Sequence, residues 1–351
     1  MKKVNLSVKK KNYNIFINKL KDAKLKKVYS EFKRNLEKEG QGLKKFSIAI
    51  SGGPDSMALA YLAKTYSIQK KINFFYYIVD HKLRSQSSKE ANHIKNILKK
   101  FGIYCKILTW KGKKVTSNIQ SIARENRYSL IFKECEKKNI NFIITAHHND
   151  DLYENFFIRL VRGSGLKGLT SFSKTKAKIN KKKDIYILRP LLNISKKDLL
   201  YVTKNTLNYW INDPSNNKDY FLRIKIRKLL NLLDSEGLSL DKFKLTLKNL
   251  YKSNLSIDYY VRQNIKKNSN QLNNKKLIII NETFFKHPDE IVFRSLSELV
   301  HIHGNKKNYP RGSKVSSLIE NIKNINNFKK MTLSGCIFEK ANKSIVITRE
   351  S

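Results

Sequence analysis

The chain has 351 residues and a formal net charge of +44, with 40% hydrophobic residues and a mean hydropathy of −0.52. This length allows two domains with cores of their own. No run of about 18 apolar residues exists and no apolar segment follows the basic N-terminus, so we expect neither a membrane span nor a signal peptide. Cys105, Cys135 and Cys336 form no CxxC pair, which favours a cytoplasmic protein.

The positive charge favours a polyanionic partner, because neutralisation of phosphates by Lys and Arg dominates nucleic-acid binding. A coding bias toward AT-rich codons would also raise the lysine content, and only 13 of the 72 basic residues are arginine. Eight of these arginines fall between Arg84 and Arg227. Arginine therefore marks the part of the chain in which we expect the chemistry.

Residues 1–43 are rich in lysine and carry apolar residues at helical spacing, which predicts a basic helical extension. Strands and helices then alternate over residues 44–235. This order predicts an α/β domain with a doubly wound parallel sheet and ligands at the carboxyl ends of its strands. We expect strands at 46–50, 73–80, 103–110, 142–148 and 185–192, and helices at 57–64, 81–102, 117–139, 150–161, 195–207 and 218–234.

Two later segments differ in character. The lysine run at 174–184 is interpreted either as a solvated hairpin tip or as a disordered loop that contacts RNA. Composition turns to Leu, Lys and Asn after residue 235, and we expect residues 236–351 to form a smaller α+β domain. Its last segment, 331–350, predicts a β-hairpin that turns near Asn342.

The loop SGGPDS, residues 51–56, joins the first expected strand to its helix. Gly52 and Gly53 permit positive φ and close approach of a ligand, and Asp55 or Ser56 stands where a helix N-cap belongs. Backbone N–H groups at a helix start form an anion site. The loop has no Walker A lysine but has a carboxylate that can carry Mg²⁺, so it suits a released pyrophosphate better than a transferred phosphoryl group. An ordinary strand-to-helix turn is the alternative.

SGGPDS resembles the pyrophosphate loop of the ATP-pyrophosphatase superfamily, which has an adenine nucleotide alpha-hydrolase-like fold. Members cleave ATP between the α and β phosphates and adenylate a carbonyl oxygen. The resemblance implies that ATP and Mg²⁺ are cofactors and that Asp55 is the metal ligand. It assigns the phosphates to Ser51, Gly52, Gly53, Pro54, Asp55 and Ser56.

Two further blocks contain candidate side chains. Asp151 and Glu154 are three residues apart on the first turn of an expected helix, where a capping box is an equally reasonable interpretation. His148 precedes them at a strand end. Arg124 and Arg127 also share a helix face and could clamp a phosphate or an RNA backbone, or could simply form an exposed basic face.

The order of these blocks resembles the tRNA(Ile)-lysidine synthase family over about residues 46–230. The matching segments are VDHKLRSQSSKEA, NIQSIARENRY, AHHNDDLYEN, RGSGLKGL, RPLL, WINDPSN and FLRIKIRKLL. The resemblance implies that ATP adenylates the C2 carbonyl oxygen of the wobble cytidine in a CAU-anticodon tRNA(Ile). The ε-amine of free lysine then displaces AMP and forms lysidine.

The same resemblance implies roles for individual residues. Asp55, Arg124, Asp151 and Glu154 are expected to be catalytic, the two acidic residues of the helix by binding the lysine ammonium and accepting its proton. Asp80 and His81 are expected near the nucleotide. Contacts to tRNA are expected from Arg84, Arg127, His148, Arg162, Arg223 and Arg227, and from the C-terminal domain.

Three positions in two segments depart from the family pattern. Asn155 replaces the familiar Thr after the glutamate, and still offers hydrogen bonds. Lys225 stands where the usual run has an arginine and Ile224 where it has asparagine, and lysine does not reproduce the planar bidentate fork of arginine.

The expected partners are tRNA(Ile) and free lysine, with no membrane, and a homodimer is compatible with the sequence. A tRNA thiolase shares the adenylation step but needs a persulfide cysteine or an iron–sulfur cluster. A non-catalytic basic RNA-binding protein would explain the charge but not the loop or the carboxylates.

Overall fold

The structure, a computed structural model, shows two compact units, Met1–Phe243 and Lys244–Ser351. No helix in the described part of the chain is both long enough and apolar enough to cross a lipid bilayer. The described residues are 15–40, 42–82, 86–112, 119–172, 176–180, 184–211, 222–272, 277–306, 308–324, 328 and 330–350.

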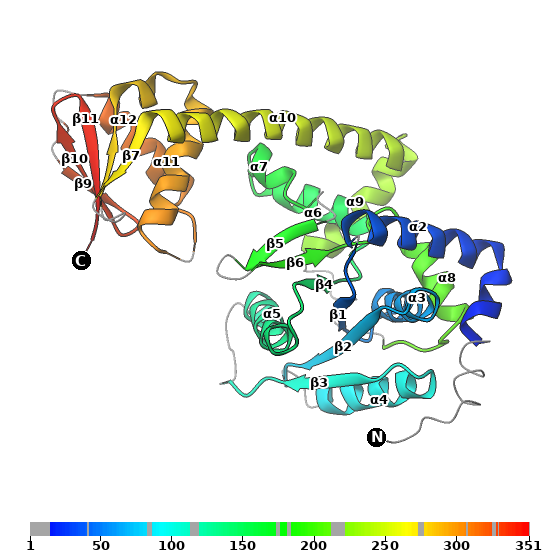
Figure 1. Cartoon of the computed structure of the whole chain (residues 1–351). Helices are drawn as coiled ribbons and strands as arrows, with labels where there is room; N and C mark the ends of the chain where they lie inside the picture. The colour runs from blue at the N-terminus through cyan, green and yellow to red at the C-terminus, as the bar shows by residue number, and fades with distance from the viewer. Residues whose placement is uncertain are drawn as a thin grey trace. The chain divides into compact units, whose positions relative to one another are not determined.

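The first unit is built on a six-stranded sheet with the order β3-β2-β1-β4-β6-β5 (Figure 1). Five strands are parallel, and β5 pairs antiparallel with β6 at one edge. The chain steps outward from β1 to β3 and returns to β4 on the other side of β1. The carboxyl ends of β1 and β4 therefore flank the crevice where such sheets bind ligands. The strands are Lys45–Ile50 (β1), Asn73–Asp80 (β2), Cys105–Thr109 (β3), Phe142–Ile144 (β4), Lys176–Asn180 (β5) and Ile185–Leu188 (β6).

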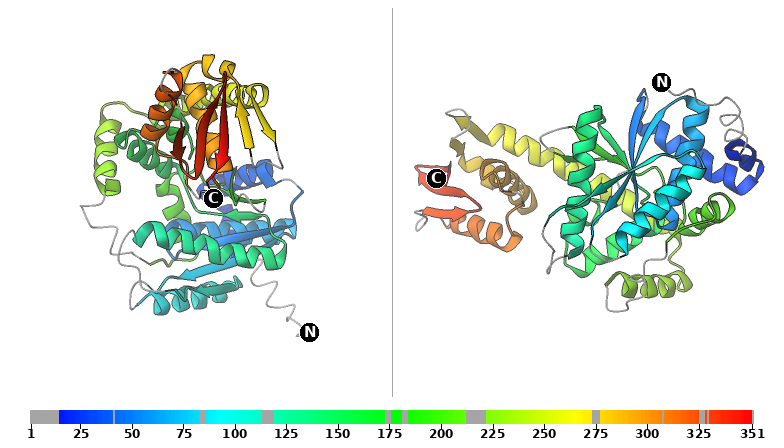
Figure 2. Two further views of the ribbon diagram at one scale, coloured as in Figure 1. Left: turned by 90° about the vertical axis from the view of Figure 1, so that its left-hand side faces the viewer. Right: turned by 90° about the horizontal axis from the view of Figure 1, so that it is seen from below.

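Helices cover both faces of this sheet, which confirms the predicted doubly wound α/β domain (Figure 2). Tyr76 and Ile78 of β2 join one apolar cluster with the helices α3, α4 and α8, and Tyr77 joins another with α5. The helices of this unit are η1 (Lys19–Lys21), α2 (Ala23–Gly40), α3 (Pro54–Lys70), α4 (Ser87–Lys100), α5 (Ile119–Lys138), α6 (Asn149–Val161), α7 (Leu166–Leu169), α8 (Lys196–Asn205) and α9 (Leu222–Ser235).

The sequence of α3 explains its central place. Most of its residues from Ser56 to Tyr66 are buried, and apolar and small residues surround the helix on all sides. A helix that is apolar all round belongs inside a core. The buried helix thus fixes the position of its own first turn, which follows the loop after β1.

The sequence predicted a separate N-terminal extension, but the N-terminal helix is part of the first unit. Phe16, Leu25, Val28, Phe32 and Leu36 are all buried in the cluster that contains α3. The helical spacing of Leu25, Val28, Phe32 and Leu36 gives α2 one apolar face, and the sheet domain covers that face. The prediction failed because the dense lysines occupy only the opposite, solvated side.

The division between the units also differs from the prediction, since it follows Phe243 and not residue 235. Phe243 lies near the start of α10 (Leu240–Asn268), and its ring centroid is 4.3 Å from that of Tyr153 and 5.1 Å from that of Phe156. These aromatic contacts attach the start of α10 to α6. In the lysine run, residues 176–180 form strand β5, which pairs antiparallel with β6 and favours the hairpin interpretation over the disordered loop.

The second unit combines a five-stranded antiparallel sheet, ordered β7-β8-β11-β10-β9, with helices α11 and α12. This is the predicted smaller α+β architecture. Ala341 pairs with Ser344, so Asn342, with φ of 53°, begins a two-residue turn of the terminal hairpin. The elements are β7 (Ser269–Leu272), β8 (Leu277–Ile280), η3 (Glu282–Lys286), α11 (Asp289–His303), α12 (Gly312–Lys323), β9 (Lys330–Leu333), β10 (Cys336–Ala341) and β11 (Ser344–Arg349).

Candidate active site

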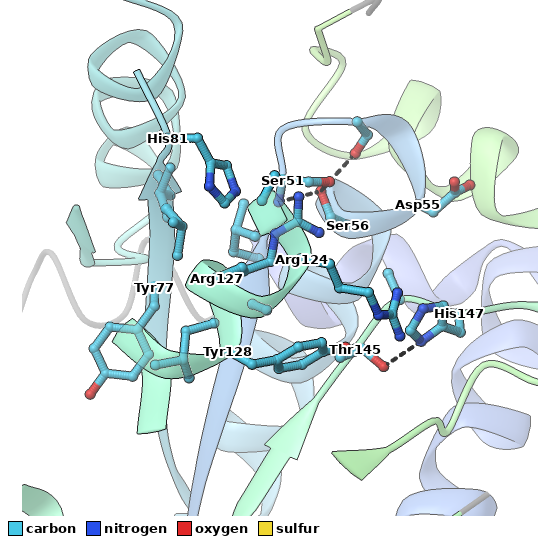
Figure 3. A pocket seen from close by; sticks show the side chains of 18 of the residues that line it. Ser51, Asp55, Ser56, Tyr77, His81, Arg124, Arg127, Tyr128, Thr145 and His147 are labelled. Atoms are coloured by element: carbon cyan, nitrogen blue, oxygen red, sulfur yellow. Dashed lines mark hydrogen bonds between the residues drawn. The ribbon is translucent and has the colours of Figure 1, made fainter. Parts of the chain in front are cut away.

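A cavity of about 760 Å³ lies in the first unit at the carboxyl ends of β1, β2 and β4. Its volume is in the range that holds a nucleotide-sized ligand. Three structural parts supply most of the polar wall: the loop after β1, the end of β2 with the facing side of α5, and α6 with the segment before it. Figure 3 shows ten of the lining residues by name.

The loop after β1 is held in shape by Ser56. Its Oγ accepts hydrogen bonds from the backbone N–H groups of Ser51 (3.3 Å) and Gly52 (3.1 Å) and donates one to the Gly53 carbonyl at 2.9 Å. Gly53, not Asp55 or Ser56, is the N-cap of α3. Pro54 occupies the first helical position, where its fixed φ favours an earlier start than the sequence pattern suggested.

The two glycines of this loop differ in backbone conformation and in the space around an added Cβ. Gly52 has φ of +87°, and a Cβ there would lie 3.2 Å from both Ile211 Cδ1 and Ile94 Cγ1. Gly53 has φ of −73°, and the nearest atom to an added Cβ is Ser51 Oγ at 3.8 Å. Gly52 is therefore required by the fold, whereas Gly53 leaves its space open toward the cavity.

Asp55 stands on the first turn of α3 at the cavity wall. Its Oδ1 is buried and has no hydrogen-bond partner among the described residues. Its Oδ2 lies 3.5 Å from Nε2 of His148. A buried carboxylate oxygen without a donor is costly unless something else satisfies it, so this atom fits a cation ligand.

His148 is 5% exposed and lies among three carboxylates, and its expected contact with tRNA stays a prediction. Burial opposes its charge, but Asp55, Asp151 and Asp150 together raise the pKa of the imidazole above its usual value. The ring thus bridges the start of α3 and the start of α6. Its burial follows from its place as N-cap of α6, which the sequence alone did not show.

The end of β2 contributes Asp80 and His81 to the cavity. Both Asp80 oxygens are engaged, with Ser87 Oγ at 2.8 Å and Ser88 Oγ at 2.5 Å. Burial alone would raise the pKa of Asp80, but the hydrogen bonds from Ser88, the Lys82 amide and Ser87 hold it below its usual value. Asp80 therefore shapes the wall by fixing the start of α4.

His81 differs from its neighbour, since neither ring nitrogen has a hydrogen-bond partner among the described residues. Burial, and then the charge of Arg127, lower the pKa of His81 to about 4. The imidazole is neutral at physiological pH and can donate or accept one hydrogen bond from a ligand. Figure 3 shows it on the same side of the cavity as Ser51 and Arg127.

Helix α5 brings Arg124 and Arg127 to the cavity, as their spacing predicted. The guanidinium of Arg124 lies over the ring of Tyr128, 5.3 Å from its centroid. Burial lowers the pKa of Arg127. The pair gives this wall two positive charges, Arg127 beside Ser51 and Ser56 and Arg124 directed toward His147 (Figure 3), an arrangement that suits a polyphosphate.

One face of α6 forms the remaining wall. Asp151, Asn155 and Arg159 all line the cavity, and each is four residues from the next. Asp151 also caps the helix, because its Oδ2 accepts the backbone N–H of His148 at 2.9 Å. The capping and the functional interpretations of Asp151 are therefore compatible, since the carboxylate has a second oxygen.

Glu154 is absent from the residues that line the cavity and is only 2% exposed. Its Oε1 accepts a hydrogen bond from Nε of Arg227 in α9 at 2.5 Å, and this contact helps to raise the pKa of Arg227 against the effect of burial. Glu154 and Arg227 are thus paired with each other, and the expected roles of Glu154 in lysine binding and of Arg227 in tRNA binding stay predictions. A three-residue step on α6 turns Glu154 toward α9 and leaves Asp151 toward the cavity.

The other predicted tRNA contacts have separate outcomes. Arg162 is exposed at the end of α6, outside the cavity wall. Arg84 lies outside the described residues, and so does the side chain of Arg223.

The sequence interpretation missed a group of residues beside α6. Arg189 is 6% exposed after β6, and its guanidinium lies 4.6 Å from the ring centroid of Phe172, a cavity residue. The ring of His147 contacts the same phenylalanine edge-on, while its Nδ1 is 2.8 Å from Thr145 Oγ1. The arginine of the RPLL segment was the available signal for this cluster.

Comparison with known proteins places these residues in context. Residues 21–233 match the model of the PP-loop domain family. The tRNA(Ile)-lysidine synthase of Orientia tsutsugamushi (strain Boryong) is 35% identical over 319 residues, a match that covers 87% of this chain and 70% of the relative. The corresponding enzyme of Wolbachia pipientis wMel is 32% identical over 307 residues, with the same coverage.

Among solved structures, the tRNA thiolase NcsA of Methanococcus maripaludis is similar in fold. It matches with a TM-score of 0.56 at 17% sequence identity and covers 65% of this chain and 79% of its own. Identity this low supports a shared fold only.

Proposed function

This chain belongs to the tRNA(Ile)-lysidine synthase family of PP-loop, ATP-using ligases, and from this premise we propose that it converts the wobble cytidine of a CAU-anticodon tRNA(Ile) to lysidine. In the first step the C2 carbonyl oxygen attacks the α-phosphorus of ATP, and diphosphate leaves. In the second step the neutral ε-amine of free L-lysine attacks C2, and AMP leaves with the bonding electrons of the C–O bond.

The observation that carries this proposal is the loop after β1. Ser56 binds the backbone on the inside of the loop, Gly53 leaves open space on the cavity side, and α3 begins at that point. A helix start with exposed N–H groups holds a diphosphate without a lysine side chain. The nearby Arg124 and Arg127 neutralise charge that develops as the bond to the leaving diphosphate breaks.

Magnesium fits the same end of the cavity. Asp55 offers a buried oxygen without a donor, and Mg²⁺ in nucleotide sites is usually held by one or two carboxylates together with phosphates and water. Bound Mg²⁺ would add positive charge at the phosphates. Asp55 is the residue that would hold it, and His148 fixes the other carboxylate oxygen of Asp55.

Asp151 is the proposed partner of the incoming amine. Its carboxylate lines the cavity and is 23% exposed at the side chain, so a cationic ligand can reach it. Lysine arrives as an ammonium, and only the neutral amine is a nucleophile. Asp151 binds the ammonium and accepts its proton as the C–N bond forms.

The thiolase alternative lacks a suitable sulfur. Cys105 and Cys135 are absent from the cavity lining, and burial raises the pKa of Cys105 to about 12 and that of Cys135 to about 11. Neither is a thiolate at neutral pH, and the thiolate is the reactive form.

The second unit supplies a surface suited to the tRNA body. One stripe of α10 is exposed and combines four cations with an apolar side chain and a tyrosine: Lys248, Lys252, Leu255, Tyr259, Arg262 and Lys266. These positions repeat at helical spacing, so they form one continuous face. Basic groups contact phosphates and a tyrosine can stack on an exposed base. The double change Lys252→Ala and Arg262→Ala should weaken tRNA binding and make its salt dependence less steep.

The proposed reaction is tested by incubating the protein with transcripts, ATP, Mg²⁺ and labelled lysine. Label should enter the CAU-anticodon tRNA(Ile) and release one AMP per lysine incorporated. Incorporation into no tRNA, or incorporation of sulfur in place of lysine, would refute the proposal. The substrates are cytoplasmic molecules, so a cytoplasmic location follows from the reaction, and light scattering with and without tRNA tests for a homodimer.

A further inference from the structure

The cavity face of α6 carries a charge pattern that the two-step reaction does not yet use. Asp151 lies at its start, Arg159 two turns later and Asn155 between them, and all three line the cavity. The face therefore presents an anion, an amide and a cation in a line. Sequence reasoning had placed only Asp151 among the site residues.

Arg159 is held in place without being neutralised. A Cβ added to Gly168 would lie 3.7 Å from the Nη1 of Arg159, so the guanidinium lies close to α7. Burial, and then the neighbouring charge of Arg162, lower its pKa. Within the described residues Arg159 forms no ion pair, so its positive charge is available to an anionic group of a ligand.

Asn155 has a free acceptor beside this cation. Its Nδ2 donates to the backbone carbonyl of Asp151 at 2.7 Å, which fixes the orientation of the amide. Its Oδ1 makes no hydrogen bond to any other described residue. A fixed amide oxygen one helical turn from a guanidinium suits a ligand that carries an ammonium next to a carboxylate.

Free lysine has these groups in this order. Its ε-ammonium and α-carboxylate are about 7 Å apart in the extended chain, as standard bond lengths give. Eight helical residues separate the Cα atoms of Asp151 and Arg159 by about 12 Å, and long helical side chains point back toward the N-terminus by several ångströms. The side-chain ends are thus brought to a separation that an extended lysine can span.

We propose that Arg159 binds the α-carboxylate of free lysine and Asn155 Oδ1 its α-ammonium, while Asp151 holds the ε-amine toward the reacting base. The inference rests on the proposed function, because it assigns the amino-acid subsite of that reaction. In this proposal α6 selects an α-amino acid, and the distance between Arg159 and Asp151 selects the length of its side chain.

A nucleotide phosphate is the competing anion for Arg159, and the position of the residue favours the carboxylate. Arg127 from α5 lies beside Ser51 and Ser56 of the loop after β1 (Figure 3), whereas Arg159 shares its helix face with Asp151. If Arg159 bound a phosphate, its removal would slow diphosphate release. If Arg159 binds lysine, its removal affects only the second step, in which lysine displaces AMP.

The test compares lysine with L-lysinamide, in which the carboxylate is a neutral amide, in wild-type protein and in Arg159→Gln. Wild type should prefer lysine, and Arg159→Gln should raise the KM for lysine about 10–100-fold, as loss of a charge-assisted bidentate contact predicts. Its preference for lysine over lysinamide should fall to about one, since neither substrate then finds a cationic partner. Diphosphate exchange with tRNA and ATP alone should be unchanged.

Controls separate the possible outcomes. Arg34→Gln removes a surface arginine, 72% exposed in α2, and should leave the KM for lysine unchanged. If Arg159→Gln does not fold, Arg159→Lys keeps the charge but loses the planar fork, and should reduce the preference for lysine in part. Retention of the wild-type preference, or slower diphosphate exchange, would overturn this inference but leave the proposed function standing. Failure of the wild type to incorporate any lysine would overturn the proposed function with it.

Discussion

The loop after β1 and the helix after β4 face the same cavity but are built differently. The loop presents backbone groups, and one internal side chain, Ser56, holds its shape. Helix α6 presents side chains such as Asp151, which also accepts the backbone N–H of His148, while Arg227 in α9 holds Glu154 on another side of the helix. The loop is thus a local structure, whereas the working face of α6 is a product of packing.

This difference assigns a separate chemical task to each region. A rigid backbone cradle suits diphosphate, which is common to many ATP-using reactions. A face of side chains can be changed residue by residue and suits the group that is specific to one reaction. The following predictions test this division of tasks.

The largest effect is expected for Asp55→Asn, at the junction of the two regions. The change removes the negative charge at the proposed Mg²⁺ ligand, and we expect kcat for diphosphate release to fall about 10³-fold. Binding of tRNA should be unchanged in a filter or fluorescence assay. A variant with normal activity and an unaltered Mg²⁺ requirement would remove Asp55 from the metal site.

Gly52→Ala should be the next most severe change. Alanine at φ of +87° is strained by roughly 1–2 kcal/mol, and its Cβ would contact Ile211 and Ile94. We expect lower stability in chemical denaturation and a loss of diphosphate release of about 100-fold, because the loop must shift.

Gly53→Ala is the matched control for that strain. Gly53 has negative φ and an added Cβ has room, so the free energy of unfolding should be unchanged while the KM for ATP rises. Equal destabilisation by both substitutions would contradict the different reasons given for the two glycines.

Asp151→Asn and Glu154→Gln should have opposite signatures despite their three-residue spacing. Asp151→Asn is expected to slow lysine incorporation about 100-fold with little effect on diphosphate exchange. Glu154→Gln should instead lower the free energy of unfolding by about 1–3 kcal/mol, because it removes the buried negative charge that pairs with Arg227. Lysine kinetics of the two variants, set beside their denaturation curves, decide the assignment. A large increase in the KM for lysine with normal stability in Glu154→Gln would restore its expected catalytic role.

The smallest effect concerns pH. Because the pKa of folded His148 is raised, its charge stabilises the fold below the unfolded value of 6.5, and this contribution is lost as pH rises through the folded pKa. The difference in unfolding free energy between wild type and His148→Gln should therefore be larger at pH 6 than at pH 8.5. An equal difference at both values would mean that the imidazole is neutral throughout.

The same two regions show what sequence alone could predict. The glycine turn and the helix start after β1 were predicted because they are local properties, although the N-cap is Gly53 and not Asp55 or Ser56. The fold followed from the alternation of strands and helices. The orientation of Glu154, the burial of His148 and the contribution of Arg159 were missed, because each depends on which neighbouring element covers a given side of α6.

The N-terminal helix shows a related limit. Its lysines gave residues 1–43 the composition of an appendage, yet Phe16 and Phe32 are buried in the main core. Composition averages over both sides of a helix, while packing depends on one. Only the apolar spacing carried information about the fold.

Exchange of labelled diphosphate into ATP tests the central claim most directly, because it reports the adenylation step at the loop after β1. With CAU-anticodon tRNA(Ile) present and lysine omitted, we expect exchange that disappears without tRNA and falls sharply in Gly52→Ala. Exchange that requires lysine and proceeds without tRNA would mean that the amino acid, not the nucleobase, is activated, and would contradict the account.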